Sequence, residues 1–573
     1  MDTLNYPLQY RRLITRQVKI GRLLIGAGSP VLIQSMLTTA TDKVQECIEE
    51  ISALHQVGCE LIRLTIPTRK SLDSVVHIRN RMKEEGLTVP LVADVHFSPK
   101  LAVDACELFE KVRINPGNFS DSSRSEKQQG DGICFKEGHD KLREAIQPLI
   151  KNLKKYQRAL RIGVNHGSLS HRMMERYGDS PSGMIQSALE MIDLFEDQGF
   201  KDMVVSLKSS NPLVVQKAYR LLIEKSPKKD MVALHLGVTE AGNGSMGRIK
   251  SLVGIGALLL DGIGDTIRVS LTEPSTNEIP FAKSLLKSLG DLSGSEECSS
   301  EFWKRPLNHQ RVENLSQDLT QTEIGASTPI KLGTQKDVAL PETDIKFNPD
   351  FSYSFDSDTL YLEDLSKPVF RVTKEDSVPT GFVPDQYSAI LIDTTNPLAT
   401  LREYYKDQAE SIKNIPVGVI YPEDSSRHNL KYETFLAAIL SEGLTDFILI
   451  PPKITSDRLM RLLYLMQATR AKILITDYIA CPSCGRTLFD LIDTTEKIKS
   501  RTKHLKGLKI GIMGCIVNGP GEMADADFGY VGSGPGKIDL YYGQERVCRG
   551  IDEKNAVGAL IDLIKEKGRW VPE

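Results

Sequence analysis

The 573-residue chain is poor in cysteine and carries little net charge, and each shortage excludes a class of protein. Nine cysteines are too few for a disulfide scaffold of this length, so we expect reduced thiols and a cytoplasmic location. A formal net charge of −3 provides no broad basic surface, and the sequence therefore predicts no nucleic-acid partner.

Long apolar runs are missing as well. No run reaches about 18 residues, the length that a membrane-spanning helix needs, so we predict no membrane partner. The N-terminus lacks the apolar core of a signal peptide. Strand-like sequence begins by about Arg12, which leaves no room for a transit segment. The length itself predicts about three or four domains.

Three of the nine cysteines form a pattern that suits a metal centre. Cys481 and Cys484 belong to Cys-Pro-Ser-Cys, and Cys515 follows an apolar run and enters the turn Gly-Cys-Ile-Val-Asn-Gly-Pro-Gly-Glu. Three thiolates leave one coordination position open, whereas structural zinc sites are closed by four ligands. Glu522 is the nearest oxygen ligand in the sequence. The pattern favours an iron–sulfur centre, with half of a zinc knuckle or a redox pair as the alternatives.

The other cysteines show no ligand spacing. Cys548 could add a fourth thiolate, but it lies in an alternating, strand-like stretch, where we expect it to pack. The remaining cysteines are scattered and are expected to be inert; they are Cys47, Cys59, Cys106, Cys134 and Cys298.

Strand-like and helix-like segments alternate eight times in the first 290 residues. This alternation predicts a (β/α)8 barrel rather than a doubly wound open sheet. The connection from 119 to 156 begins with a polar stretch and is predicted to be an inserted loop. The predicted strands are Val31–Met36, Leu61–Ile66, Pro90–Phe97, Val112–Pro116, Leu160–Asn165, Met203–Ser209, Met231–Leu236 and Thr266–Leu271. The predicted helices include Lys43–Val57, Lys100–Glu110, Pro181–Gln198, Pro212–Glu224 and Arg248–Leu260.

Cations gather at the predicted carboxyl ends of these strands, where barrel active sites lie. They are Arg63, Arg113, Arg161, Lys208 and Arg268. Converging cations repel one another unless an anion lies between them, and guanidinium and ammonium groups suit phosphate oxygens. We therefore predict a small, strongly anionic substrate, such as a phosphate or diphosphate ester. Internal pairing with acids such as Asp94 and Glu240 is the alternative.

Three further side chains are candidates for proton transfer. Glu240 follows a predicted strand in Thr-Glu-Ala-Gly-Asn-Gly, a turn that can place it over the barrel mouth. A carboxylate beside an anion site has a raised pKa and can deliver a proton. His166 and His235 are weaker acid–base candidates at strand ends.

Two more segments follow the barrel. Residues 291–474 comprise an irregular linker to about 343 and then a degenerate, barrel-like α/β domain. This domain shows no dense set of charges at strand ends, so we expect it to be a scaffold or spacer. Its predicted strands are Leu360–Leu362, Val369–Val372, Ala389–Asp393, Val417–Tyr421, Asp446–Pro451 and Lys472–Ile475, and its helices are Leu398–Lys413, Leu430–Glu442 and Ser456–Ala468. Residues 475–573 predict a compact α+β domain with helices Arg486–Thr502 and Asn555–Lys567 and strands Lys509–Met513, Phe528–Val531 and Lys537–Tyr542.

Six motifs together resemble the 4-hydroxy-3-methylbut-2-enyl diphosphate synthase family. They are Cys-Pro-Ser-Cys-Gly-Arg, Gly-Cys-Ile-Val-Asn-Gly-Pro-Gly-Glu, Val-Ala-Asp-Val-His-Phe, Arg-Ile-Asn-Pro-Gly-Asn, Arg-Ile-Gly-Val-Asn-His-Gly-Ser-Leu and His-Leu-Gly-Val-Thr-Glu-Ala-Gly. The match covers about residues 10–290 and 475–573, and the middle segment resembles the long type of this family. The resemblance implies a TIM barrel at 1–290, an inserted α/β domain at 291–474 and an iron–sulfur domain at 475–573.

The resemblance also implies a reaction. This is the reductive ring opening of 2-C-methyl-D-erythritol 2,4-cyclodiphosphate, which gives 4-hydroxy-3-methylbut-2-enyl diphosphate in the non-mevalonate isoprenoid pathway. The electrons would come from flavodoxin or ferredoxin, because no GxGxxG fingerprint for a nucleotide lies between a strand and a helix.

The residues implied by the resemblance fall into three groups. A [4Fe-4S] cluster would be held by Cys481, Cys484, Cys515 and Glu522, with Glu522 as the labile ligand. The substrate would be held by Arg63, Arg113, Arg161, Lys208, Asn165 and Ser270, and Asp94, His96 and His235 match further motif positions. Glu240 would be the acid near the reacting carbons.

Several alternatives stay open. One is a non-redox barrel of the pteroate synthase type with a zinc-binding tail, and another is a hydro-lyase whose cluster acts only as a Lewis acid. A zinc-dependent nucleic-acid module is disfavoured because a basic, aromatic-rich surface is missing. A radical enzyme that cleaves S-adenosylmethionine is disfavoured because its CxxxCxxC triplet is absent. Cluster and barrel could meet within one chain or across a homodimer, and either arrangement predicts a closing motion that excludes water.

Overall fold

The computed structural model describes most of the chain as two compact units. The described residues are 12–96, 98–120, 135–226, 230–290, 330–345, 347–356, 359–362, 368–373, 386–387, 389–394, 396–408, 416–422, 429–516 and 519–572. The larger unit comprises those between 12 and 290 together with those from 476 onward, and the smaller unit comprises those from 330 to 475. The finer division into three domains stays a prediction. No helix in these ranges combines the length and the hydropathy needed to cross a membrane.

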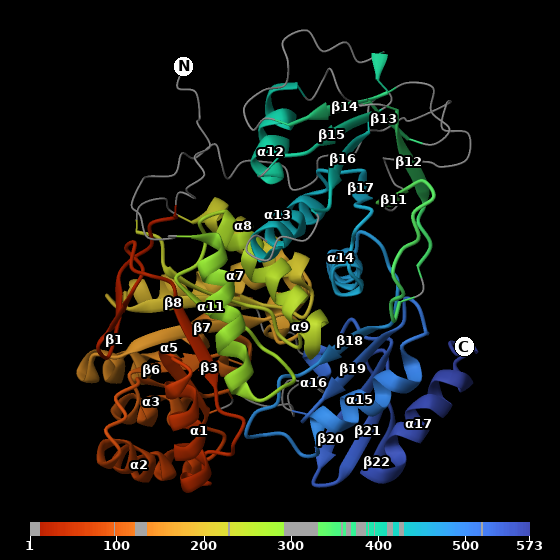
Figure 1. Ribbon diagram of the computed structural model, residues 1–573. Coiled ribbons are helices and arrows are strands. Elements are labelled where there is room, and N and C mark those ends of the chain that lie inside the picture. The colour runs from red at the N-terminus through yellow and green to blue at the C-terminus, as the bar shows by residue number, and fades with distance from the viewer. Residues whose placement is uncertain are drawn as a thin grey trace. The chain divides into compact units, whose positions relative to one another are not determined.

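Eight parallel strands close into a barrel in the larger unit, which confirms the predicted fold (Figure 1). The strands are β3 (Leu32–Met36), β4 (Leu61–Thr65), β5 (Leu91–Asp94), β6 (Lys111–Ile114), β7 (Ala159–Asn165), β8 (Met203–Lys208), β9 (Ala233–Gly237) and β10 (Thr266–Arg268). The register of β10 against β3, with Thr266 opposite Leu32, closes the ring. All eight predicted strands are present, with bounds that differ by a few residues.

Helices follow most of the strands, and several begin at a side-chain cap. Thr68, Ser98, Ser180 and Asn211 each accept a hydrogen bond from a backbone N–H of the first helical turn. The helices are α1 (Val44–Gln56), α2 (Arg69–Glu84), α3 (Pro99–Leu108), α4 (Pro116–Ser120), α5 (Phe135–Tyr156), α6 (His171–Tyr177), α7 (Pro181–Glu196), α8 (Pro212–Lys225), α9 (Gly244–Ser251), α10 (Ala257–Leu260) and α11 (Glu278–Leu289). A π-helical turn, Leu252–Gly256, joins α9 to α10, so the helix predicted at Arg248–Leu260 begins earlier and is irregular.

The predicted inserted loop at 119–156 is wrong for its second half. Residues 135–156 form α5, which buries an apolar face that includes Leu142, Ile146 and Leu149. These residues recur at spacings of three and four, the period of an amphipathic helix. The polar stretch 121–131 lies outside the described residues.

A short hairpin closes the amino-terminal end of the barrel. Strands β1 (Val18–Ile20) and β2 (Leu23–Ile25) pair antiparallel. Their side chains pack against the first inward residues of the barrel strands, among them Leu32, Leu61 and Val204. Each such fully buried aliphatic side chain contributes on the order of 1.5–3 kcal/mol. The apolar plug leaves the carboxyl end as the polar end of the barrel.

The last part of the larger unit is a five-stranded sheet with helices. Its strand order is β18 (Asp477–Ala480), β19 (Lys509–Met513), β20 (Phe528–Gly534), β21 (Lys537–Tyr542) and β22 (Glu545–Asp552). The helices are α15 (Leu491–Thr502), α16 (Gly519–Glu522) and α17 (Glu553–Glu566). The helix predicted at Arg486–Thr502 begins only at Leu491, because Asp490 caps it by accepting from the Asp493 N–H. Residues 481–490 therefore form a loop.

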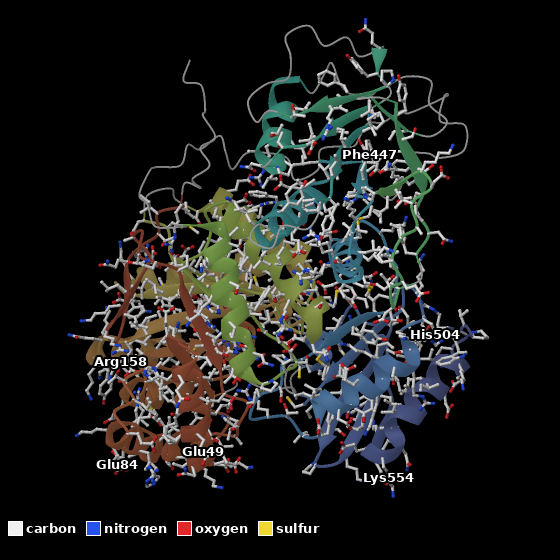
Figure 2. The ribbon with its side chains drawn as sticks, viewed as in Figure 1. Glu49, Glu84, Arg158, Phe447, His504 and Lys554 are labelled. Atoms are coloured by element: carbon white, nitrogen blue, oxygen red, sulfur yellow. The ribbon has the colours of Figure 1, made fainter. Side chains whose placement is uncertain are left out.

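The smaller unit contains a mixed seven-stranded sheet. Its strand order is β13 (Thr359–Leu362), β12 (Phe351–Asp356), β11 (Lys331–Gln335), β17 (Phe447–Ile450), β16 (Val417–Ile420), β15 (Ala389–Ile392) and β14 (Val369–Val372). Its helices are α12 (Pro397–Gln408), α13 (Asn429–Glu442) and α14 (Ser456–Ala468). The edge strands β13 and β14 also lie close to each other, so the sheet is strongly curled. Figure 2 labels Phe447, whose ring belongs to the core of this sheet.

Two predictions in this segment are wrong. Lys472–Ile475 forms no strand, because the Leu474 N–H donates to the side chain of Gln467 instead of to a neighbouring strand. Strand β11 lies in a stretch that was predicted to be irregular. Its sequence, Lys-Leu-Gly-Thr-Gln, has a single large apolar residue, so the pattern of alternation is hidden.

Candidate active site

A cavity of about 100 Å³ lies at the carboxyl ends of the barrel strands and is lined by both parts of the larger unit. Met36, Asp94, Asn165, Lys208 and Arg268 are each the last residue of a strand. The barrel contributes Met36, Arg63, Asp94, His96, Arg113, Arg161, Asn165, Lys208, Thr239, Glu240, Arg268 and Ser270. The C-terminal part contributes Cys481, Pro482, Ser483, Cys484, Arg486, Met513, Gly514, Cys515, Gly519 and Glu522.

Apart from the acid–base candidate His166, the lining contains every site residue named from the sequence except His235. That histidine is fully buried in β9, and its Nδ1 hydrogen-bonds the hydroxyl of Thr266. Burial and the nearby Lys208 hold its pKa well below the usual value, so the ring is neutral. His166, the other predicted acid–base histidine, also lies outside the lining, where its Nε2 is 3.1 Å from the backbone oxygen of Asp179.

Cations outnumber their partners at the barrel mouth. Burial lowers the pKa of Arg63 to about 10, although Asp94 opposes this effect. Burial and the neighbouring arginines also hold the pKa values of Arg161 and Lys208 well below their usual range. Among the described residues, Nε and Nη1 of Arg161 have no hydrogen-bond partner. Because buried donors are normally paired, this arrangement calls for an anion.

One carboxylate serves several of these cations. Asp94 lies 3.0 Å from Arg113 Nη1, 3.4 Å from His96 Nε2 and 3.6 Å from Arg486 Nη1. Burial alone would raise its pKa, but the charges of Arg63 and Arg113 hold it well below the usual value. Asp94 is therefore ionised and supplies one negative charge to a cluster that holds several positive ones.

Arg268 is held differently. Its Nη2 lies 3.3 Å from Oε1 of Glu278, a carboxylate that is only 2% exposed. Ser35 Oγ donates to the other oxygen of the same carboxylate at 2.7 Å. Internal pairing, the alternative raised from the sequence, therefore holds for Arg268, whereas Arg63, Arg161 and Lys208 remain without a carboxylate of their own among the described residues.

His96 is neutral in this site. Burial, followed by the charge of Arg113, lowers the pKa of His96 to about 3. Its Nε2 hydrogen-bonds Nη1 of Arg113, and Asn118 Nδ2 lies 3.2 Å from its Nδ1. A neutral ring can accept a hydrogen bond from a guanidinium, which an imidazolium cannot do. The ring therefore orients Arg113 without adding charge.

A pair of glutamates faces the cavity from the two parts of the unit. Glu240 follows β9 with φ of +48°, a strained conformation for a residue other than glycine, and is 3% exposed. Burial and the adjacent Glu522 raise its pKa well above the usual value. Asn165 Nδ2 donates to Glu522 Oε1 at 2.7 Å. The raised pKa favours the protonated form of Glu240, which can donate a proton into the cavity.

Three thiols face the same cavity. Cys481 follows β18 and Cys515 follows β19, while Cys484 lies in the loop between them. The Gly514 N–H donates to Cys481 Sγ at 3.3 Å. Burial, followed by the nearby Cys484, raises the pKa of Cys481 well above the usual value, so this sulfur needs a bound cation to remain a thiolate.

The donor set fits an iron–sulfur cluster. No group of three or more His, Cys, Asp or Glu side chains within the described ranges is already arranged to hold a metal ion. Three thiols and Glu522 nevertheless line one small cavity, and a backbone N–H points at one sulfur, as is usual around cluster thiolates. A closed structural zinc site would need a fourth thiol or histidine, and the rest of the lining offers only His96, which is engaged with Arg113.

The other described cysteines lie away from the cavity lining. Burial raises the pKa values of Cys47, Cys59 and Cys106 to about 12, so these thiols are unreactive at neutral pH. Cys548 packs against the core of the five-stranded sheet, as its alternating pattern indicated. Cys134 and Cys298 lie outside the described residues.

The C-terminal part lies on the mouth of the barrel of its own chain. Thr272 Oγ1 donates to the backbone oxygen of Cys481 at 3.0 Å, and Lys250 Nζ lies 2.8 Å from Asp477 Oδ1. Gly167 and Gly521 bring their backbones so close that a Cβ on either would overlap the other's carbonyl group. Barrel and thiols thus meet within one chain, and a homodimer stays a prediction.

Two lining residues carry chemistry that the sequence reasoning missed. Met36 Sδ accepts from Arg63 Nη2 at 2.8 Å, and Arg486 reaches Asp94 from the C-terminal loop. Met36 ends a predicted strand, and an apolar residue at that position gives no sign of a contact with a guanidinium. The sequence offered a signal for Arg486, because this residue belongs to the motif Cys-Pro-Ser-Cys-Gly-Arg. It was predicted to lie in a helix, however, and that prediction gave no reason to expect its side chain at the cavity.

Comparisons with known proteins identify the family. The model of the GcpE TIM-barrel domain matches residues 15–283, and that of the GcpE protein C-terminal domain matches residues 477–566. The 4-hydroxy-3-methylbut-2-en-1-yl diphosphate synthase (flavodoxin) of Porphyromonas gingivalis is 40% identical, and the alignment covers 98% of each chain. Proteins of the same name from Akkermansia muciniphila (38% identical; 99% of this chain, 98% of that one) and Leptospira interrogans (37% identical; 98% of each) are similar throughout. The chain therefore belongs to the GcpE family of 4-hydroxy-3-methylbut-2-en-1-yl diphosphate synthases.

Proposed function

We propose that this chain converts 2-C-methyl-D-erythritol 2,4-cyclodiphosphate to (E)-4-hydroxy-3-methylbut-2-enyl diphosphate in isoprenoid biosynthesis. The reaction takes up two electrons and two protons. It opens the cyclic diphosphate by breaking a carbon–oxygen bond and releases one hydroxyl as water. The observation that carries the proposal is a single cavity that joins buried cations, the buried glutamate Glu240 and three thiols. The names of the relatives support flavodoxin as the electron donor, with ferredoxin as the alternative.

The diphosphate binds among the cations of the barrel mouth. Arg63, Arg113, Arg161 and Lys208 converge there, and phosphate oxygens accept from the unpaired N–H groups of Arg161. An anion also offsets the mutual repulsion that, after burial, lowers the pKa values of Arg63, Arg161 and Lys208. Asn165 and Ser270, which line the same cavity, add hydrogen bonds, and Asp94 and His96 keep Arg113 in place.

Electron transfer depends on the thiol side of the cavity. A [4Fe-4S] cluster held by Cys481, Cys484, Cys515 and Glu522 would supply single electrons and a Lewis-acidic iron there. Asn165 orients the Glu522 carboxylate through its 2.7 Å hydrogen bond. Glu240 holds a proton beside the reacting carbons and delivers it to the departing hydroxyl.

Exclusion of water is built into the same arrangement. A cavity of about 100 Å³ is smaller than most ligand pockets, which measure roughly 300–1,000 Å³. Substrate entry therefore requires the C-terminal loops to move away from the barrel mouth and then return. Their return shields reactive intermediates from solvent.

The proposal is tested first by composition and reductant dependence. The full chain is purified anaerobically, its iron, sulfide and zinc are measured, and turnover of the cyclic diphosphate is followed with and without a one-electron reductant. About four irons per chain and strictly reductant-dependent ring opening are expected. Zinc in place of iron would point to the non-redox barrel, and turnover without reductant would point to the hydro-lyase.

The thiol assignment is tested with a pair of serine variants. Cys515→Ser removes one of three sulfurs from the cavity, so we expect loss of the cluster and of turnover, by about 1,000-fold or more. Cys548→Ser changes a thiol in the core of the five-stranded sheet and should keep its iron. Equal iron content in the two variants would contradict the assignment.

A further inference from the structure

Arg486 is the one cation that the C-terminal part adds to the described lining of the cavity. Its side chain is 10% exposed and lies in the loop between β18 and α15. Nη2 donates to the backbone oxygen of Asp94 at 3.3 Å, and Nη1 lies 3.6 Å from Asp94 Oδ2. Both distances are long for hydrogen bonds of a guanidinium, so Asp94 holds this group only loosely.

The surroundings of Arg486 are positively charged. Asp94 is already engaged by Arg113 at 3.0 Å. The charge of Arg486 also contributes to the lowered pKa values of Arg63 and His96, which means that it repels the cations of the barrel. Without an anion, placing this guanidinium at the mouth is unfavourable. An anion bound between the two parts would attract both Arg486 and the cations of the barrel, so the same placement would become favourable.

Backbone contacts fix where Arg486 points. A Cβ on Gly485 would lie 2.8 Å from Ala40 Cα and 2.9 Å from the backbone oxygen of Thr39, so the loop lies directly on the barrel mouth. On the other side, Thr487 Oγ1 accepts from the Cys484 N–H at 3.1 Å. Arg486 is therefore held over the cavity from both sides whenever the loop is seated.

We propose that Arg486 binds the diphosphate from the C-terminal side, so that anion binding and seating of the loop on the barrel favour each other. This inference rests on the proposed function, because it takes a diphosphate as the ligand of the cavity. Coupling of this kind is reciprocal. If seating of the loop raises the affinity for the ligand by some factor, ligand binding must shift the equilibrium toward the seated loop by the same factor. Arg486 thereby links substrate recognition to the exclusion of water.

The test uses inorganic pyrophosphate and the full-length, anaerobically purified protein. Its dissociation constant is measured by titration calorimetry, and seating of the loop is followed by hydrogen exchange in peptides that span residues 477–490. In the unaltered chain, pyrophosphate should bind and slow exchange in these peptides. Arg486→Gln should weaken binding by about 10- to 100-fold, as expected for loss of a charge-assisted contact, and abolish the slowing.

Lys250→Gln is the matched control. Lys250 contacts Asp477 and the backbone of Tyr478 where the same two parts meet, but it lies outside the cavity lining. This variant should speed exchange with and without pyrophosphate and keep the slowing that pyrophosphate causes. Arg486→Lys keeps the charge but loses the two-pronged contact, so a weakening smaller than that of Arg486→Gln is expected.

Three results would overturn the inference. Arg486→Gln that binds pyrophosphate with unchanged affinity and unchanged slowing would contradict it and leave the proposed function intact. If Arg486→Gln does not fold, unchanged affinity in Arg486→Lys would have the same meaning. Failure of the unaltered chain to bind pyrophosphate would contradict both the inference and the diphosphate site on which it rests.

Discussion

The barrel is built from parallel strands and the seven-stranded sheet largely so, yet their charged side chains are arranged in different ways. In the smaller unit, four cations each have a carboxylate of their own. The pairs are Arg371–Asp393, Arg402–Glu442, Arg461–Glu433 and Lys472–Asp350. At the barrel mouth, several cations share Asp94.

The pKa directions express the same difference. Burial alone would lower the pKa of Arg461, but Glu433 raises it above the usual value. Burial lowers the pKa of Arg63, and neighbouring cations lower it further. A cation that is paired with a carboxylate costs the fold little stability. A cluster of buried cations without carboxylates destabilises the fold, and such clusters are typical of sites that bind an anion. The comparison therefore distinguishes the cation cluster of the barrel mouth, which an anion would complete, from the internally paired charges of the smaller unit.

The largest effect is expected from glycines that serve different purposes in the two units. Gly521 allows the C-terminal part to touch the barrel backbone at Gly167, and it precedes Glu522. Gly521→Ala forces the two backbones apart, so turnover should fall by about 100-fold or more while the free energy of unfolding changes little. Steady-state kinetics and thermal unfolding of the same preparation measure the two quantities.

Gly418→Ala is the counterpart in the smaller unit. A Cβ there would overlap the ring of Phe447 in the core of the sheet. We expect a loss of about 1–3 kcal/mol in stability and unchanged turnover per folded molecule. If both alanine variants lost stability and kept activity, seating of the C-terminal part would not matter for the reaction.

A smaller effect is expected when one arginine in each unit is replaced. The change in stability should have opposite signs in the two units. Arg161→Gln relieves repulsion among buried cations and removes donors without partners, so the ligand-free protein should gain about 1 kcal/mol in stability. The same change should weaken binding of the cyclic diphosphate by about 100-fold. Arg461→Gln instead leaves the buried carboxylate of Glu433 unpaired and should cost about 2 kcal/mol, with substrate affinity unchanged. Thermal unfolding and substrate titration distinguish the two; destabilisation by both variants would remove the distinction.

The barrel could be predicted because its signal is repeated. Eight apolar runs separated by helical patterns leave few alternatives, and strand ends then place polar residues at one mouth. This reasoning located Arg63, Lys208 and Asn165 at the cavity, since each lies on or at the end of a predicted strand. It also named His235 near a strand end, but β9 continues to Gly237, and His235 is level with Thr266, the first residue of β10.

Long-range contacts could not be predicted. The direction of Arg486 depends on a loop that ends at Asp490 and on the close approach of Gly485 to Thr39. Local periodicity predicts neither feature. The helix start depends on a single cap, and the contact of Gly485 with Thr39 joins residues that are hundreds of positions apart. Strand β11 was not predicted for a related reason. It is stabilised by pairing with β12 and β17, and its own sequence shows no alternation that would indicate a strand.

The smallest effect concerns His96 and appears only as a function of pH. The pKa of His96 is about 3 in the folded protein and about 6.5 in an unfolded chain, so between these values the unfolded state binds the extra proton. Stability from the neutral ring is therefore complete above about pH 6.5 and declines as the pH falls, by about 1 kcal/mol between pH 6.5 and pH 5.5. His96→Gln has no such proton, and it should flatten this part of the curve of unfolding temperature against pH. Asp94, whose pKa is also depressed, acts in a lower window, because its contribution is lost only as the pH falls below about 4. An unchanged slope in His96→Gln would mean that the ring is charged in the folded protein, and a charged ring could not accept a hydrogen bond from Arg113.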